Sequence, residues 1–225
     1  MSPSNDFDRR RLLCGVSLAV LALMFAIDPF LAFAVGSPSG MGSIAAIGFA
    51  MPLLMACLVG AVFAITQLLR GTADRTGLLG GALVVMGWTA GVRIIELRQL
   101  DSALQSGIAG VPPDVLERLF AAAPILWRSI VPSGILFPIG FAILGVAIVV
   151  TAPIPRWIGA VMVAAAVLFP NGRIGGLVWA IRAADAALAA SFALLAWQIL
   201  SRPEAWQRAD ATRSESPGAF VAAAV

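Results

Sequence analysis

The sequence contains no histidine, no lysine and no tyrosine, so all fifteen cationic side chains are arginine. Without lysine, the chain cannot form a retinal Schiff base, a pyridoxal linkage or a Walker A phosphate loop. Without histidine, it has no imidazole ligand for haem or zinc and no Ser-His or Cys-His catalytic pair. These absences exclude several cofactor classes, and we predict no cofactor, no metal site and no catalytic residue.

Charged side chains are also scarce, at 12% of the 225 residues, whereas a soluble domain has about 25%. Hydrophobic residues make up 60% of the chain, and the mean hydropathy is +0.95. Cys14 and Cys57 lie in separate apolar runs without metal-ligand spacing, so we interpret them as core residues. The composition predicts a multi-pass membrane protein. Its apolar runs of about 20 residues fit helices better than barrel strands.

Six apolar runs predict an all-α fold with six transmembrane helices in one bundle, within a domain that covers residues 12–200. The predicted spans are 12–35, 43–69, 77–97, 129–151, 157–170 and 174–200. Between the third and fourth spans, Pro112-Pro113-Asp114 precedes residues with one apolar face. This pattern predicts a short amphipathic helix that lies on the membrane or caps the bundle. Pro170-Asn171-Gly172-Arg173 predicts a turn.

The third span carries two glycine pairs with four-residue spacing, Gly77/Gly81 and Gly87/Gly91. Glycines at this spacing allow the backbones of two membrane helices to approach closely. We therefore expect this span to pack tightly against a neighbour.

The arginines are distributed unequally between the two sides of the predicted membrane. Six helices put both termini on one side, where the loops hold nine arginines against six on the other. The positive-inside rule therefore assigns the basic N-terminus, residues 1–11, and the tail, residues 201–225, to the cytoplasm. The polar tail is predicted to be disordered. The lysine-free composition rich in Ala, Gly and Arg indicates a bacterial protein, which we assign to the cytoplasmic membrane.

The start of the chain also resembles a signal peptide, because three arginines precede an apolar run that begins at Leu12. The run is long, however, and Asp28 interrupts it. We therefore expect an uncleaved first helix, with Ala32 and Ala34 as the alternative cleavage-site residues.

Charged residues inside the apolar runs form the candidate site, because such residues are costly in a membrane and usually have a partner or a function. Arg93 and Glu96 lie near the end of the third span, and Arg182 and Asp185 repeat the pairing of opposite charges in the sixth. Counting a rise of about 1.5 Å per residue puts Arg93 and Asp185 at one depth, about 22–24 Å from the cytoplasmic boundary. If the antiparallel third and sixth helices touch, Arg93 meets Asp185 and Glu96 meets Arg182.

The predicted polar layer also includes other residues at similar depth. The network comprises Asp28, Arg93, Glu96, Asn171, Arg173, Arg182 and Asp185, and the candidate pocket walls are Trp88, Trp127 and Trp179. A purely structural reading competes with this one. Each i, i+3 pair can satisfy itself within its own helix, the arginines can extend towards water, and the tryptophans can be interfacial aromatics.

Residues Gly134 to Ile174 include Leu136-Phe137-Pro138-Ile139-Gly140, Pro155-Arg156-Trp157 and Leu168-Phe169-Pro170. This pattern, over about a fifth of the chain, resembles one seen in small uncharacterised bacterial multi-pass membrane proteins. The resemblance implies an integral membrane protein with six to eight helices. It brings no activity and no residue roles with it.

Three classes of function stay open. The first is an accessory or binding protein, whose arginines would hold an anionic small molecule or lipid headgroup. The second is a small transporter or proton-coupled carrier, in which Asp28, Glu96 or Asp185 carries protons. The third is a membrane enzyme that works without histidine. The expected partners are the lipid bilayer and a second membrane protein or a second copy of this chain, and nucleic acid is not expected.

Overall fold

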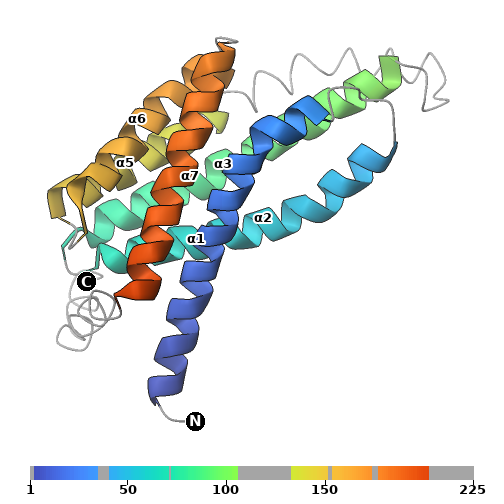
Figure 1. Cartoon of the computed structure of the whole chain (residues 1–225). Helices are drawn as coiled ribbons and strands as arrows, with labels where there is room; N and C mark the ends of the chain where they lie inside the picture. Colours follow the sequence, from blue (N-terminus) through green and yellow to red (C-terminus); the bar gives the residue numbers. More distant parts are fainter. Residues whose placement is uncertain are drawn as a thin grey trace, which may run out of the picture.

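The computed structural model describes six helices and no strand within residues 3–34, 41–70, 72–105, 133–151, 154–173 and 177–202 (Figure 1). The helices are α1 (Pro3–Ala34), α2 (Met41–Leu68), α3 (Asp74–Gln105), α5 (Leu136–Thr151), α6 (Arg156–Arg173) and α7 (Val178–Ser201). The predicted all-helical class is therefore confirmed. The predicted amphipathic helix in the connection after α3 and the predicted disordered tail lie outside the described residues.

The helices form a closed ring in which each one packs against its neighbours in the chain, and α7 returns to pack against α1 (Figure 1). The remaining packed pairs are α1 with α2, α2 with α3, α3 with α5, α5 with α6 and α6 with α7. In this order α3 and α7 stand on opposite sides of the ring. The closure of α7 on α1 joins the two ends of the helical domain.

Several helix ends differ from those expected. α1 begins at Pro3 and so includes the basic segment, and α3 continues to Gln105. α6 runs through the predicted turn to Arg173, with Pro170 inside the helix. The Asn171 Nδ2 group donates a hydrogen bond to the Val167 carbonyl at 2.8 Å. A Cβ atom on Gly172 would lie 2.6 Å from the Ile181 backbone nitrogen, so close packing on α7 outweighs the turn tendency of the sequence.

Glycines set the closest helix contacts in the ring. A Cβ atom on Gly145 would lie 2.7 Å from the Gly159 carbonyl oxygen, which joins α5 to α6. A Cβ atom on Gly140 would lie 2.6 Å from the Gly80 carbonyl oxygen, which joins α5 to α3. These distances are too short for any side chain, so only glycine lets the backbones approach this closely. Of the glycines expected to pack closely, Gly81 meets Val62 of α2 and Gly87 meets the α5 backbone, whereas Gly91 shows no such contact with the described residues.

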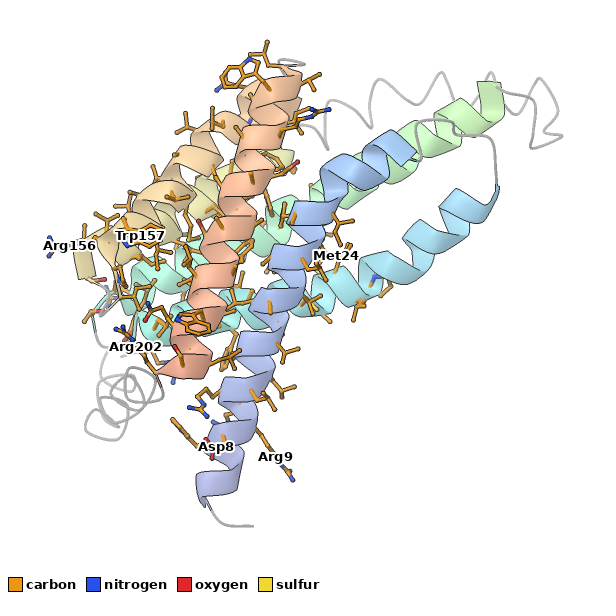
Figure 2. All side chains as sticks on the ribbon, viewed as in Figure 1. Asp8, Arg9, Met24, Arg156, Trp157 and Arg202 are labelled. Carbon is orange, nitrogen blue, oxygen red and sulfur yellow. The ribbon has the colours of Figure 1, made fainter. Side chains whose placement is uncertain are left out.

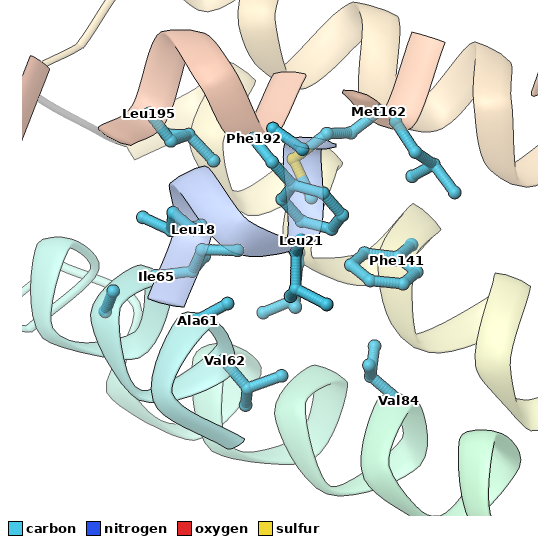
Figure 3. Packing of buried hydrophobic residues seen from close by; sticks show 14 of the residues in the cluster. Leu18, Leu21, Ala61, Val62, Ile65, Val84, Phe141, Met162, Phe192 and Leu195 are labelled. Atoms are coloured by element: carbon cyan, nitrogen blue, oxygen red, sulfur yellow. The ribbon is translucent and has the colours of Figure 1, made fainter. Parts of the chain in front are cut away.

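The ring interior is filled with apolar side chains, and Figure 3 shows several of them converging from α1, α2, α3, α5, α6 and α7. Leu18, Leu21, Ile65 and Leu144 are completely buried, and Phe141 is 1% exposed. Side chains buried to this extent are typical of a close-packed protein interior. It fills the bundle at the levels that these residues occupy.

The outer surface is apolar as well. Large apolar side chains are exposed on every described helix, among them Leu13 on α1, Phe63 on α2, Met86 on α3, Val150 on α5 and Val167 on α6. Two helical segments, Phe7–Ile27 and Val178–Ser201, are long and apolar enough to cross a membrane. These segments are consistent with association of the protein with a membrane.

Most of the charged side chains that the structure describes lie at one end of the ring, which we call the basic end (Figure 2). It comprises the start of α1, the α2–α3 turn, the α5–α6 turn and the end of α7. Its described arginines are Arg9, Arg10, Arg11, Arg70, Arg75, Arg156 and Arg202. Between the two ends of the described helices, the charged side chains that the structure describes are Arg182 and Asp185, both in α7.

Candidate functional site

Six aromatic rings from five helices form one connected layer across the ring interior. The Trp88 ring of α3 lies 5.4 Å from Phe137 of α5 and 6.4 Å from Phe25 of α1, between ring centroids. Phe137 also contacts Phe169 of α6, at 5.0 Å. Separations of 4.5–7 Å are typical of stabilising aromatic pairs.

Phe192 of α7 completes this aromatic layer. Its ring lies 5.8 Å from Phe25 and 5.6 Å from Phe141, and Phe141 is 4.8 Å from Phe137. The layer therefore ties α1, α3, α5, α6 and α7 together at one level. α3 and α7 meet within it only through rings of other helices.

Trp88 contributes the one polar atom among these rings. Its indole Nε1 atom is buried and has no hydrogen-bond partner within the described part of the chain. A buried donor without an acceptor costs about 1–3 kcal/mol, and a buried tryptophan usually has an acceptor for this group. One turn further along α3, no atom of the described residues outside this stretch of helix lies within 4 Å of the position that a Gly91 side chain would occupy. An acceptor atom of a bound molecule would satisfy the Trp88 N–H.

Asp185 lies on the interior face of α7, on the side of the aromatic layer away from the basic end. It is seven residues from Phe192 and therefore on the same helix face, and its exposure is 0%. Asp185 interacts with another group of the folded chain. A fully buried carboxylate in an apolar segment is expensive, and such residues commonly mark functional sites.

The structure describes five of the ten residues predicted for the site. Besides Trp88 and Asp185, these are Arg182, Asn171 and Trp179, which are all exposed. The Asn171 amide group donates its hydrogen bond to the Val167 carbonyl, within its own helix. Trp179 is 62% exposed, so it lies on the outer surface and not among the interior rings.

Asp28, Arg93, Glu96 and Arg173 lie within described helices, but the structure does not describe their side chains, and Trp127 lies outside the described residues. The ring order bears on the pairs proposed between the third and sixth helices. α7 packs on α1 and α6, whereas α3 packs on α2 and α5. The two helices are not side by side, so a pair between them would have to reach across the ring interior.

The sequence reading missed the aromatic layer, although a signal for it exists. An aromatic residue lies one to two turns from a predicted polar residue in four helices. The pairs are Phe25 with Asp28, Trp88 with Arg93, Phe169 with Arg173, and Phe192 with Asp185. Because apolar residues surround each ring in the sequence, no single helix distinguishes a layer that forms only when five helices meet.

Comparison with protein families, with curated proteins and with solved structures finds no match for this chain. Within the described residues, no group of three or more acidic or cysteine side chains is placed to hold a metal ion. The groups that the structure describes at this site are the Trp88 indole donor, the buried Asp185 carboxylate and aromatic surface. These groups suit a molecule with an apolar body and a polar head.

Proposed function

We propose that this chain is a six-span protein of the bacterial cytoplasmic membrane that binds a small amphiphilic molecule or lipid. The site would lie between the aromatic layer and the end of the bundle opposite the basic end. The buried Trp88 N–H, which has no hydrogen-bond partner among the described residues, is the observation that carries the binding proposal. Asp185, on the same side of the layer, would supply a second polar contact.

The outer surface of α7 supports the membrane assignment. Trp179 and Trp197 are 62% and 67% exposed. They are 18 residues apart, so they lie on the same face of the helix about 27 Å from each other. Tryptophan is enriched at both membrane interfaces, which are separated by a hydrocarbon core of about 30 Å. On this register, Asp185 lies about 9 Å from the level of Trp179, within the apolar region.

The lengths of the shorter helices fit the same thickness. α5 has 16 residues and α6 has 18, which correspond to about 24 Å and 27 Å. A small mismatch with the bilayer is accommodated at modest cost. The arginines of the basic end favour the cytoplasmic side for that end, by the positive-inside rule.

Binding is favoured over transport because the half of the ring nearer the basic end is filled. Leu18, Leu58, Ile65, Leu144 and Ile148 there are completely buried. A carrier would need these side chains to separate during each cycle. A proton-coupled carrier is the second candidate, and the buried Asp185 carboxylate favours it, because a carboxylate within a membrane span is a common proton carrier.

Native mass spectrometry of the full chain tests the binding proposal. The protein would be purified from membranes in mild detergent and then incubated with a bacterial polar lipid extract. Trp88→Phe keeps a ring but removes the N–H donor, so the fraction of protein with a bound mass should fall about threefold to tenfold. Trp197→Phe, at an exposed position, should bind as the wild type does. Equal binding by all three proteins, or no bound mass in any, would contradict the proposal.

The carrier candidate needs a separate measurement. Asp185→Asn removes the proton site with little change in volume. If the protein is a proton-coupled carrier, this variant should still bind the molecule seen as a bound mass. It should no longer carry that molecule into proteoliposomes when a pH gradient is applied. Uptake that is absent from the wild type as well would rule out this candidate and leave the binding protein.

A further inference from the structure

The basic end combines a high density of positive charge with a partly buried arginine that has an unused donor. The described side chains of this end include seven arginines and two acidic residues, Asp8 and Asp74. Figure 2 shows Arg156, Arg202 and Arg9 at the ends of their helices. Such a surface attracts anions, and the chemistry at Arg11 indicates where one would bind.

Arg11 lies on the interior side of α1 together with Leu18, seven residues further along the helix. Its side chain is 22% exposed, and its Nη2 atom lies 3.5 Å from the Asp8 carboxylate. Its Nε atom is buried and has no hydrogen-bond partner within the described residues. Asp8 therefore contacts the guanidinium group through Nη2, while the neighbouring Nε–H donor has no acceptor among the described residues.

Two further arginines come from the helices on either side of α1. The contact of Gly15 with Leu200 aligns the start of α1 with the end of α7. Arg202, two residues beyond Leu200, is thus about level with Arg11. The contact of Gly60 with Ser17 aligns α2 with α1 in the same way. Arg70, which follows α2, then lies about one turn from the level of Arg11.

The surroundings of this cluster favour a lipid over a soluble anion. Leu12 and Leu13, next to Arg11, are 56% and 67% exposed. On α7, Trp197 and Leu200 are exposed next to Arg202. Apolar surface of this kind beside the arginines fits acyl chains that belong to the same molecule as the anion. A soluble phosphate would use the charges alone.

We propose that Arg11, Arg70 and Arg202 bind the phosphate of an anionic phospholipid in the leaflet next to the basic end. The Arg11 Nε–H donates to a phosphate oxygen, and the other two arginines add charge and further donors. Arginine suits this role because its planar donor edge matches phosphate geometry. The proposal rests on the membrane insertion proposed above, but it is independent of the Trp88 site.

Lipid-binding measurements on the full chain test this site. Detergent-solubilised protein would be titrated with phosphatidylglycerol and, separately, with phosphatidylcholine, and the bound fraction followed by native mass spectrometry. The wild type should prefer phosphatidylglycerol. Arg11→Gln and Arg202→Gln should each reduce that preference about fivefold, since an arginine near an anionic lipid contributes about this factor.

Arg75→Gln is the matched control, because it removes the same charge from the same end but from α3, on the far side of the ring from α7. Its preference should change less than about twofold. Arg202 is exposed, so its replacement keeps the test valid if Arg11→Gln does not fold. Equal losses in the Arg202 and Arg75 variants would show a diffuse charge effect and overturn the site. Complete displacement of phosphatidylglycerol by inorganic phosphate would also overturn it, in favour of a soluble anion.

Membrane extraction separates this failure from that of the proposed function. If alkaline carbonate releases the wild-type chain from membranes, membrane insertion is wrong and the lipid site falls with it. If the chain stays in the membrane but binds both lipids equally, the lipid site alone is wrong.

Discussion

The contact between α3 and α5 at Gly87 gives a sharp prediction for the variant Gly87→Ala. An added Cβ atom would lie 2.6 Å from the Phe137 Cα atom and 2.7 Å from the Leu136 carbonyl carbon, and it would also meet the Phe137 nitrogen. All three atoms belong to the backbone, so no side-chain rotation can relieve the overlap. Ordinary contact needs about 3.5–4.0 Å, and the two helices must therefore separate by about 1 Å.

The cost of this separation can be bounded. Overpacking of a tight contact costs about 1–3 kcal/mol. Replacing glycine by alanine within a helix stabilises the helix by up to about 1 kcal/mol. Phe137 belongs to the aromatic layer, and its ring lies 5.4 Å from Trp88, so separation also loosens that pair. We expect a net loss of about 1–2 kcal/mol in the free energy of unfolding, within the overpacking range.

Gly91→Ala is the matched control in the same helix. Outside its own stretch of helix, no described atom lies within 4 Å of its added methyl group, so the helix propensity gain should dominate and stability should stay equal or rise by up to about 1 kcal/mol. Reversible unfolding of both variants in mixed detergent and SDS micelles would measure the difference. If both variants lose stability equally, or if Gly87→Ala is as stable as the wild type, the close α3–α5 contact is refuted.

Three further predictions concern the rest of the ring. Gly159→Ala should also destabilise the bundle by about 1–3 kcal/mol, since its Cβ atom would meet the α5 backbone at Gly145; unchanged SDS unfolding would contradict that contact. Leu21→Ala should cost about 2–5 kcal/mol because Leu21 is completely buried, whereas Leu23→Ala, at a 57% exposed position, should change little in the same assay. Both cysteines are buried, so a maleimide should label the native chain only on unfolding; rapid labelling of the folded protein would show that the helices around them are not packed as described.

The existence of six helices was predictable from the sequence, because apolar runs separated by polar turns define them almost directly. The buried position of Asp185 was also predictable, since a charged side chain in an apolar run is costly when it faces lipid. The ends of the helices were harder to predict from the sequence. The end of α6 depends on the contact of Gly172 with Ile181 of α7, which no local pattern records, and the sequence therefore predicted a turn at Pro170.

The order of helices around the ring could not be predicted for a different reason. The helices are apolar on nearly every side, so hydrophobic periodicity does not show which face meets which neighbour. From the sequence, charges on the third and sixth helices match in depth, and their pairing depends on contact between those two helices. Glycine contacts such as Gly80 with Gly140 set α3 against α5 instead. The aromatic layer follows from that order, which is why Trp88 stood out only as a candidate pocket wall.

We propose that the exposed apolar surface of the bundle faces lipid, and cysteine accessibility can decide whether it does. Ala190 and Ser201 are both exposed on α7, but Ala190 lies between the levels of Trp179 and Trp197. In a Cys14→Ala, Cys57→Ala background, Ala190→Cys and Ser201→Cys would be treated with a membrane-impermeant maleimide in inside-out vesicles. We predict rapid labelling of the Ser201 variant and almost no labelling of the Ala190 variant until detergent is added. Equal, rapid labelling of both in intact vesicles would contradict the claim.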